Sequence, residues 1–157
     1  MRHRSPRSWP RALPPSTVLP SDDEGDVTLS GLRGQHVVLY FYPKDDTSGC
    51  TAQACEFRDL GDDFAAVGAK VLGVSPAPLK SHVKFRGKYG LNFTLLSDAD
   101  HAVAEAYGVW VEKSMYGKKY MGIERSTFVI SPEGEVLHAL YKVKAKGNAA
   151  QALAGVR

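Results

Sequence analysis

The sequence has few cysteines and no long apolar segment. Two cysteines in 157 residues are too few for the disulfide framework of a small secreted protein, so a reducing compartment, the cytoplasm, is expected. No run of 18 apolar residues occurs, which predicts that no helix spans a membrane. The five histidines have no H-x-x-x-H spacing and no pairing with either cysteine, so the sequence predicts no metal site.

Negative charge is absent from the start of the chain, where positive charge is concentrated. No acidic residue precedes Asp22, and residues 1–12 account for more than the whole formal net charge of +3. The arginines of this segment are Arg2, Arg4, Arg7 and Arg11. Its Ser- and Pro-rich composition predicts a disordered basic tail. Residues 13–157 have the length of one domain and no charge pattern typical of a nucleic-acid-binding protein.

The most informative stretch is a predicted strand followed closely by a predicted helix. Residues 36–42 form an almost unbroken apolar and aromatic run, which indicates a strand buried on both faces, and Pro43 ends it. Apolar residues then recur at helical spacing, which predicts a helix over 49–67. Cys50 therefore falls in the first turn of a helix, with its side chain on the face that turns toward the core.

The other predicted elements give an α/β fold. Further strands are predicted at 27–29, 70–75, 93–96, 126–131 and 135–143, and further helices at 78–89, at 98–107 and after Asn148, which is expected to cap the last helix. Asp98 or Asp100 is expected to cap the helix before Tyr107, and residues 111–124 are predicted to form a long loop. This order implies a mixed sheet with helices on both faces.

A cysteine at the N-terminus of a helix favours its anionic form, because the first backbone N–H groups of a helix are unpaired. An ordinary cysteine is only about 3% thiolate at pH 7, and the helix terminus contributes only about 0.3–1 kcal/mol. Reactive thiolate chemistry at Cys50 therefore also needs hydrogen-bond donors and a nearby cation. Thr47 is a local donor candidate, whereas the cation must come from elsewhere in the chain.

The motif around Cys50 resembles that of a known enzyme family. Pro43-x-x-x-Thr47-x-x-Cys50 is similar to the P-x-x-x-T-x-x-C signature of peroxiredoxins, and Cys50-Thr51-x-x-Ala54-Cys55 looks like that of the peroxiredoxin Q, or bacterioferritin comigratory protein, group. Residues 92–98, 107–110 and 117–128 fit the same group. Residues 14–20 depart from it, since they lack the Asp-Phe pair that is usual there.

The resemblance implies a thioredoxin-like fold and a role for each matched residue. Cys50 would attack the O–O bond of hydrogen peroxide or an organic hydroperoxide, and Cys55 would resolve the product as a Cys50–Cys55 disulfide. Pro43 would shield the sulfur, while Thr47 and Arg125 would hold the peroxide oxygens. Thioredoxin or a similar dithiol would reduce the disulfide without haem, flavin or metal, and a monomer is expected.

Two other functions fit parts of the sequence. A protein disulfide oxidoreductase would share the broad fold, but such enzymes normally use C-x-x-C, and the cysteines here are five residues apart. A non-enzymatic holdase or redox-regulated binding module would tolerate the loss of Thr47 and Arg125. A peroxide-consumption assay distinguishes these alternatives from a peroxidase.

Overall fold

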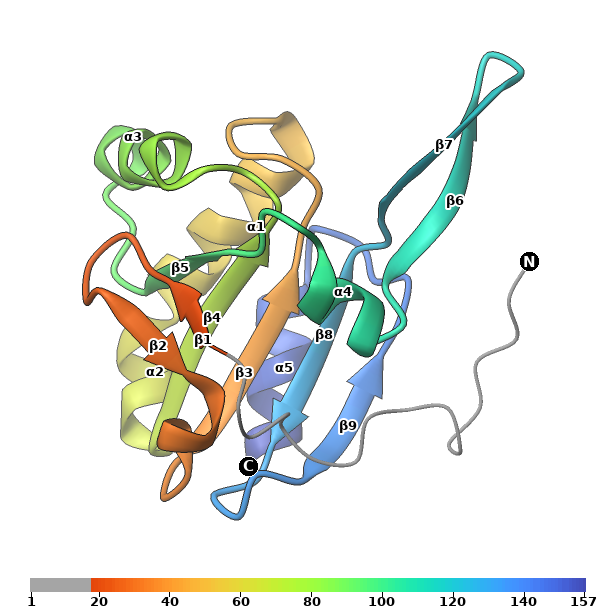
Figure 1. Ribbon diagram of the computed structural model, residues 1–157. Coiled ribbons are helices and arrows are strands. Elements are labelled where there is room, and N and C mark those ends of the chain that lie inside the picture. Colours follow the sequence, from red (N-terminus) through yellow and green to blue (C-terminus); the bar gives the residue numbers. More distant parts are fainter. Residues whose placement is uncertain (1–17) are drawn as a thin grey trace.

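The protein is built around a five-stranded sheet with the strand order β5-β4-β3-β8-β9 (Figure 1). The computed structural model describes residues 18–157, so the predicted tail, 1–12, lies outside the described residues. The strands are β3 (His36–Phe41), β4 (Ala69–Ser75), β5 (Thr94–Ser97), β8 (Ser126–Ile130) and β9 (Val136–Leu140). β3, β4 and β5 are parallel, whereas β8 and β9 are antiparallel to their neighbours. The predicted mixed sheet is confirmed.

Strand β3 occupies the middle of this sheet because both of its faces are apolar. Val37, Leu39 and Phe41 pack into the core on one side, and Val38 and Tyr40 into the core on the other. Alternate side chains of a strand point to opposite faces, so an unbroken apolar run suits a strand covered on both sides. β3 ends before Pro43, which has no N–H to donate to a sheet.

Helices cover both faces of the sheet, as predicted. They are α1 (Ser48–Asp59), α2 (Gly61–Ala66), α3 (Leu79–Tyr89), α4 (Ala102–Ala106), α5 (Asn148–Val156) and the 3-10 helix η1 (Leu29–Leu32). Side chains of α1, α2, α3 and α5 share one core; α4, η1 and the small sheet of β1 (Val18–Pro20) and β2 (Asp26–Thr28) share the other. No helix within residues 18–157 is long and apolar enough to cross a membrane.

The helix predicted over 49–67 is interrupted. α1 ends at Asp59, Leu60 adopts φ −94° and ψ 11°, and α2 starts at Gly61. A Cβ at Gly61 would lie 2.7 Å from Nδ2 of Asn92, so the chain approaches its neighbour closely at this point. The apolar spacing continues through the break because Phe57 and Phe64 pack in one core, which is why periodicity alone did not reveal it.

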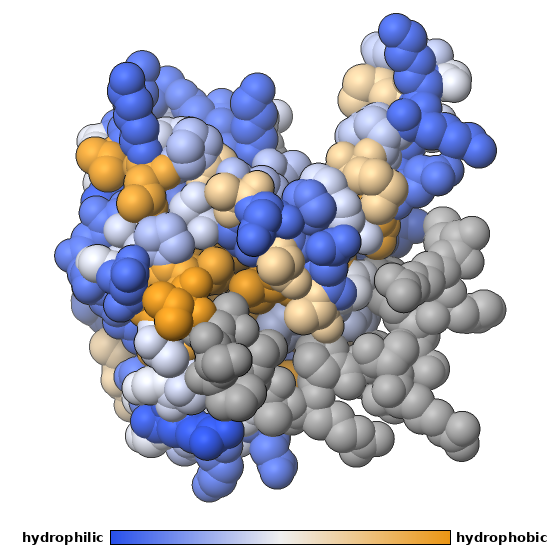
Figure 2. Space-filling model, viewed as in Figure 1, coloured by the Kyte–Doolittle hydropathy of each residue, from blue (hydrophilic) through white to orange (hydrophobic). Residues whose placement is uncertain are grey.

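The prediction of a long loop over residues 111–124 is wrong. These residues form a hairpin of β6 (Trp110–Met115) and β7 (Lys118–Ile123), which projects from the body of the protein (Figure 1). Tyr116 and Gly117 join the strands with φ of 52° and 78°, the positive values that a two-residue hairpin turn requires. Figure 2 shows the tip of the hairpin covered mainly by hydrophilic residues. Both faces are largely exposed there, so the strands lack the polar and apolar alternation that usually identifies them.

Of the two helix caps predicted, one is confirmed, although Asp98 acts from three residues before His101, the N-cap position of α4. The carboxylate of Asp98 accepts hydrogen bonds from the backbone N–H groups of Val103 and Ala104, at 3.2 and 2.8 Å, and so caps α4. Asn148 does not cap the last helix. It is the first residue of α5, after Gly147 at φ 86°, and its side chain is bonded within the protein core.

The two aspartates at the start of α4 should contribute unequally to stability. Asp98→Ala should lower the free energy of unfolding by about 1–2 kcal/mol, because it leaves two buried backbone N–H groups without partners. Asp100→Ala is the matched control: it removes one exposed bond of 3.3 Å and should change stability by less than about 0.5 kcal/mol. Urea unfolding measures both, and equal effects would contradict the assignment of the cap.

Candidate active site

Cys50 lies in the first turn of α1, directly after the sheet-to-helix loop. Thr47 is the N-cap residue of this helix, with extended backbone, and its carbonyl accepts the N–H of Thr51 at 2.8 Å. The side chain of Cys50 is 1% exposed and packs in the same core as Ala54 and Phe57, which is the face predicted from the helical spacing. A thiol at this position lies beside the unpaired N–H groups of the helix.

Arg125 brings the required cation to Cys50. Its Nη2 donates to Cys50 Sγ at 3.4 Å, and its Nη1 donates to Gln53 Oε1 at 2.6 Å. Arg125 immediately precedes β8, whose first residue, Ser126, pairs with Phe41 at the end of β3. Antiparallel pairing of two strands that are distant in sequence therefore places the guanidinium next to the start of α1.

Close approach of the guanidinium depends on a glycine. A Cβ at Gly49 would lie 3.1 Å from Arg125 Nη2, which is closer than most contacts of real Cβ atoms. With a larger residue at this position, the guanidinium would have to move by a few tenths of an ångström.

Thr47 and Pro43 lie on the loop that precedes α1. Thr47 is exposed, and its Oγ1 donates to the carbonyl of Lys44 at 3.0 Å. Its hydroxyl hydrogen is therefore used within the loop, so Thr47 is not the donor to Cys50 that the sequence predicted. The oxygen retains lone pairs that can accept a hydrogen bond. Pro43 is half-buried at the beginning of the same loop.

Cys55 is half-buried in the middle of α1, and both thiols are free. α1 is continuous from Ser48 to Asp59. On an ideal helix, residues five apart differ by about 140° in direction and have Cα atoms roughly 8.6 Å apart. A disulfide needs a Cα separation of about 4.4–6.8 Å. The two cysteines cannot bond while α1 stays helical between them.

Gln53 connects Arg125 to a buried polar network that the sequence did not predict. Gln53 Nε2 donates to Asn148 Oδ1 at 2.9 Å, and Thr127 Oγ1 donates to the same oxygen at 2.7 Å. These three side chains are at most 1% exposed. Gln53 could have been found, since it follows Cys50 by one helical turn on the same face. Asn148 has no local signal, because 95 residues separate it from Gln53.

The charge of Arg125 is not neutralised by an ion pair in the described part of the chain. Its second partner, Gln53, is an uncharged amide. The nearby Lys113 adds to the positive potential, and its pKa is lowered from the usual value by burial and by the charge of Arg125. Within residues 18–157, no cluster of His, Cys, Asp or Glu could hold a metal ion.

Comparisons with known proteins show which proteins this chain resembles in sequence and in fold. A model of the AhpC/TSA family matches residues 12–139. The putative peroxiredoxin Bcp of Coxiella burnetii is 50% identical, with 87% of this chain and 91% of the relative aligned; the peroxiredoxin Bcp of Bacillus subtilis is 49% identical, with 88% of each aligned. The structure of Xanthomonas campestris peroxiredoxin Q has a TM-score of 0.88 and 44% identity, over 94% of both chains.

Removal of the Arg125 charge should slow the reaction of Cys50. Arg125→Ala should reduce the rate with hydrogen peroxide at least tenfold, because a loss of about 1.36 kcal/mol of stabilisation is tenfold in rate. Arg125→Lys should recover part of the rate, since it keeps the charge but not the two-pronged geometry. Stopped-flow kinetics at pH 7, with thiolate absorbance at 240 nm, measures both effects. An unchanged rate in Arg125→Ala would contradict the electrostatic role.

Proposed function

Because this chain belongs to the AhpC/TSA family and is a peroxiredoxin, a thiol peroxidase, we propose that Cys50 is the residue that attacks the peroxide. The supporting observation is the contact of Arg125 with the Cys50 sulfur at 3.4 Å, at the start of a helix. This combination of cation and helix N-terminus is the environment that makes a thiol nucleophilic.

In the first step, the Cys50 thiolate attacks one oxygen of the hydroperoxide and the O–O bond breaks. The leaving oxygen takes a proton from solvent and departs as water or an alcohol, and sulfur, oxidised by two electrons, becomes a sulfenic acid. Arg125 donates hydrogen bonds to the oxygens as negative charge moves onto the leaving group. The Thr47 oxygen accepts a hydrogen bond from the O–H of the hydroperoxide, and Pro43 excludes solvent from the sulfur.

In the second step, Cys55 attacks the sulfur of the Cys50 sulfenic acid and releases water, which forms a disulfide. The helical geometry requires α1 to unwind between the two residues before this bond can form. A thioredoxin-type dithiol then reduces the disulfide, and no haem, flavin or metal takes part. We place this cycle in the cytoplasm, in a monomeric protein.

Related proteins support the choice of substrate. A structural study of the Xanthomonas campestris bacterioferritin comigratory protein, 43% identical to this chain, concerns its alkyl peroxide reduction activity and trapped intermediates. An organic hydroperoxide is therefore a candidate substrate here alongside hydrogen peroxide. A disulfide oxidoreductase or a holdase would not consume peroxide, so consumption with a thioredoxin system tests the proposal against both.

Variants of the two cysteines should separate the steps. Cys50→Ser should consume no peroxide, because the attacking sulfur is gone. Cys55→Ser should reduce one equivalent and then stop with thioredoxin, unless an external thiol resolves the sulfenic acid. Single-turnover peroxide consumption and thioredoxin-coupled turnover measure these outcomes. Full turnover by Cys55→Ser with thioredoxin alone would exclude Cys55 as the resolving residue.

Oxidation should unwind α1 from its first residue to just past Cys55. Amide exchange across residues 48–56 should be faster in the disulfide form than in the reduced form, while the later part of α1 stays protected. The far-ultraviolet circular dichroism should show lower helicity. Hydrogen exchange followed by mass spectrometry makes the comparison, and equal protection in both forms would contradict a disulfide between Cys50 and Cys55.

A further inference from the structure

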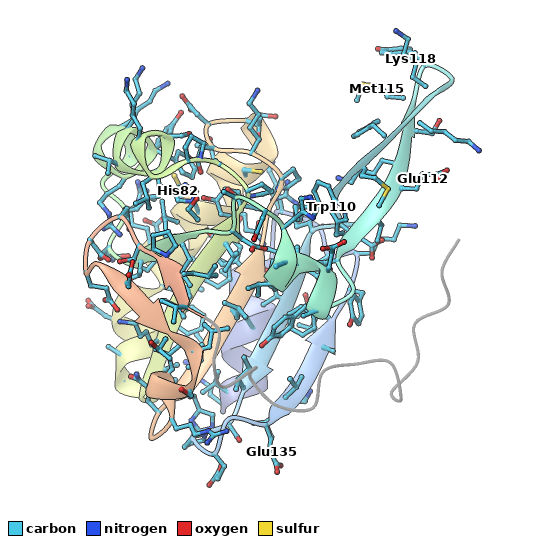
Figure 3. The ribbon with its side chains drawn as sticks, viewed as in Figure 1. His82, Trp110, Glu112, Met115, Lys118 and Glu135 are labelled. Atoms are coloured by element: carbon cyan, nitrogen blue, oxygen red, sulfur yellow. The ribbon has the colours of Figure 1, made fainter. Side chains whose placement is uncertain are left out.

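The loop of residues 43–47 is attached to helix α3 by a buried polar cluster. The carboxylate of Asp45 accepts hydrogen bonds from Tyr42 (2.6 Å) and from Ser81 (2.7 Å), and its Oδ2 lies 2.7 Å from Nδ1 of His82. His82 is completely buried and Asp45 is 7% exposed. Figure 3 shows His82 on α3, on the side of the protein away from the β6–β7 hairpin. None of these bonds involves the reacting groups.

The hydrogen bonds determine the protonation of this cluster. Nε2 of His82 lies 2.9 Å from the carbonyl oxygen of Leu96, which can only accept, so Nε2 carries a hydrogen. Burial raises the pKa of Asp45, but the bonds from His82 and Tyr42 outweigh it and hold the pKa below its usual value. Asp45 is therefore a carboxylate, and Nδ1 of His82, at 2.7 Å, is its buried partner.

A second contact holds the same loop at the other end of α3. Asp46 accepts hydrogen bonds from Lys88 at 2.8 Å and from Tyr89 at 2.5 Å. Its φ of 60° is in the left-handed region, which aspartate adopts less readily than glycine, so these bonds help to hold an uncommon backbone conformation. Successive loop residues thus bind the first and last turns of α3.

We propose that this clamp, the bonds of Asp45 and Asp46 to α3, positions the loop of Pro43 and Thr47 and opposes the unwinding of α1. The inference rests on the proposed function, in which α1 must unwind before Cys55 can reach Cys50. Thr47 is both the last residue of the loop and the N-cap of α1, so an ordered loop keeps the first turn helical. His82 and Asp45 are positioning residues, since they act through the loop.

The clamp predicts opposite effects on two steps at Cys50, the attack on peroxide and the formation of the disulfide. A looser loop should slow peroxide attack, because Thr47 and Cys50 are less well oriented. It should also speed disulfide formation, because α1 unwinds more readily. Sulfenic acid that waits longer for Cys55 can react with a second hydroperoxide, which oxidises it to a sulfinic acid and leaves as water or an alcohol. Loosening should therefore reduce sulfinic acid formed per turnover.

The experiment measures two quantities for each variant of the clamp: the rate of peroxide reduction and the sulfinic acid formed per turnover. Asp45→Ala and His82→Ala should slow single-turnover peroxide reduction by about tenfold. Sulfinic acid at Cys50 per turnover, measured by mass spectrometry at high peroxide, should fall about threefold as the unwound population rises. Asp45→Asn should lie close to the native protein, because its amide can donate to Nδ1 of an uncharged His82.

Two further variants keep the test decisive. Lys88→Met combined with Tyr89→Phe removes only the exposed bonds to Asp46, so it should fold and show the same two changes more weakly. Leu29→Ala is the stability control: this residue is buried in the core on the other face of the sheet, and it should lower the melting temperature without changing either readout.

The possible results separate the clamp from the proposed function. Slower peroxide attack together with more sulfinic acid, or folded variants with unchanged readouts, would overturn the clamp. If the alanine variants fail to fold, the same two measurements on the variant with Lys88→Met and Tyr89→Phe test the clamp. A native protein that consumes no hydroperoxide would instead overturn the proposed function.

Discussion

The contact between the Arg125 guanidinium and the Cys50 sulfur is the interaction on which the rest of the site depends. It requires β8 to pair with β3, since this pairing brings Arg125 to the end of the sheet where α1 begins. Gly49 leaves room for this approach, because a Cβ there would lie 3.1 Å from Nη2 of Arg125. Gln53 orients the guanidinium through an uncharged oxygen. A carboxylate in that place would form an ion pair and weaken the positive potential at the sulfur.

The same helix serves two arrangements that exclude each other. Gln53 lies between the two cysteines, so unwinding α1 breaks its bonds to Arg125 and to Asn148. The loss of buried hydrogen bonds makes this costly, and the helix should therefore stay folded until Cys50 has been oxidised. When Gln53 moves away, Asn148 Oδ1 keeps its hydrogen bond from Thr127. The free-energy cost of unwinding is therefore limited to the bonds of Gln53.

The sequence predicted those features that have a local or periodic signal. The buried strand β3, the helix start at Cys50 and the Asp98 cap all follow from residues close to one another in the chain. The β6–β7 hairpin was missed because both of its faces are exposed and no alternation marks them. Arg125 was found through the resemblance to a family, since an arginine at the start of a strand has no distinctive local pattern.

The bonds that order the site were beyond sequence reasoning because they join residues far apart. Asp45 and His82 are 37 residues apart, and each alone has a simple interpretation, a turn aspartate and a core histidine. Their pairing is nevertheless required by the energetics of burial, because neither group could be buried at this depth without a partner for its hydrogen-bonding atoms. α1 is thus held from two directions, by Arg125 and Gln53 on one side and by the loop on α3 on the other. Unwinding removes the first set of contacts directly, whereas the bonds of Asp45 act from outside the unwinding segment, by ordering the loop that ends at the N-cap residue Thr47. The junction between Thr47 and Ser48 is therefore where the moving part of the helix meets a fixed loop.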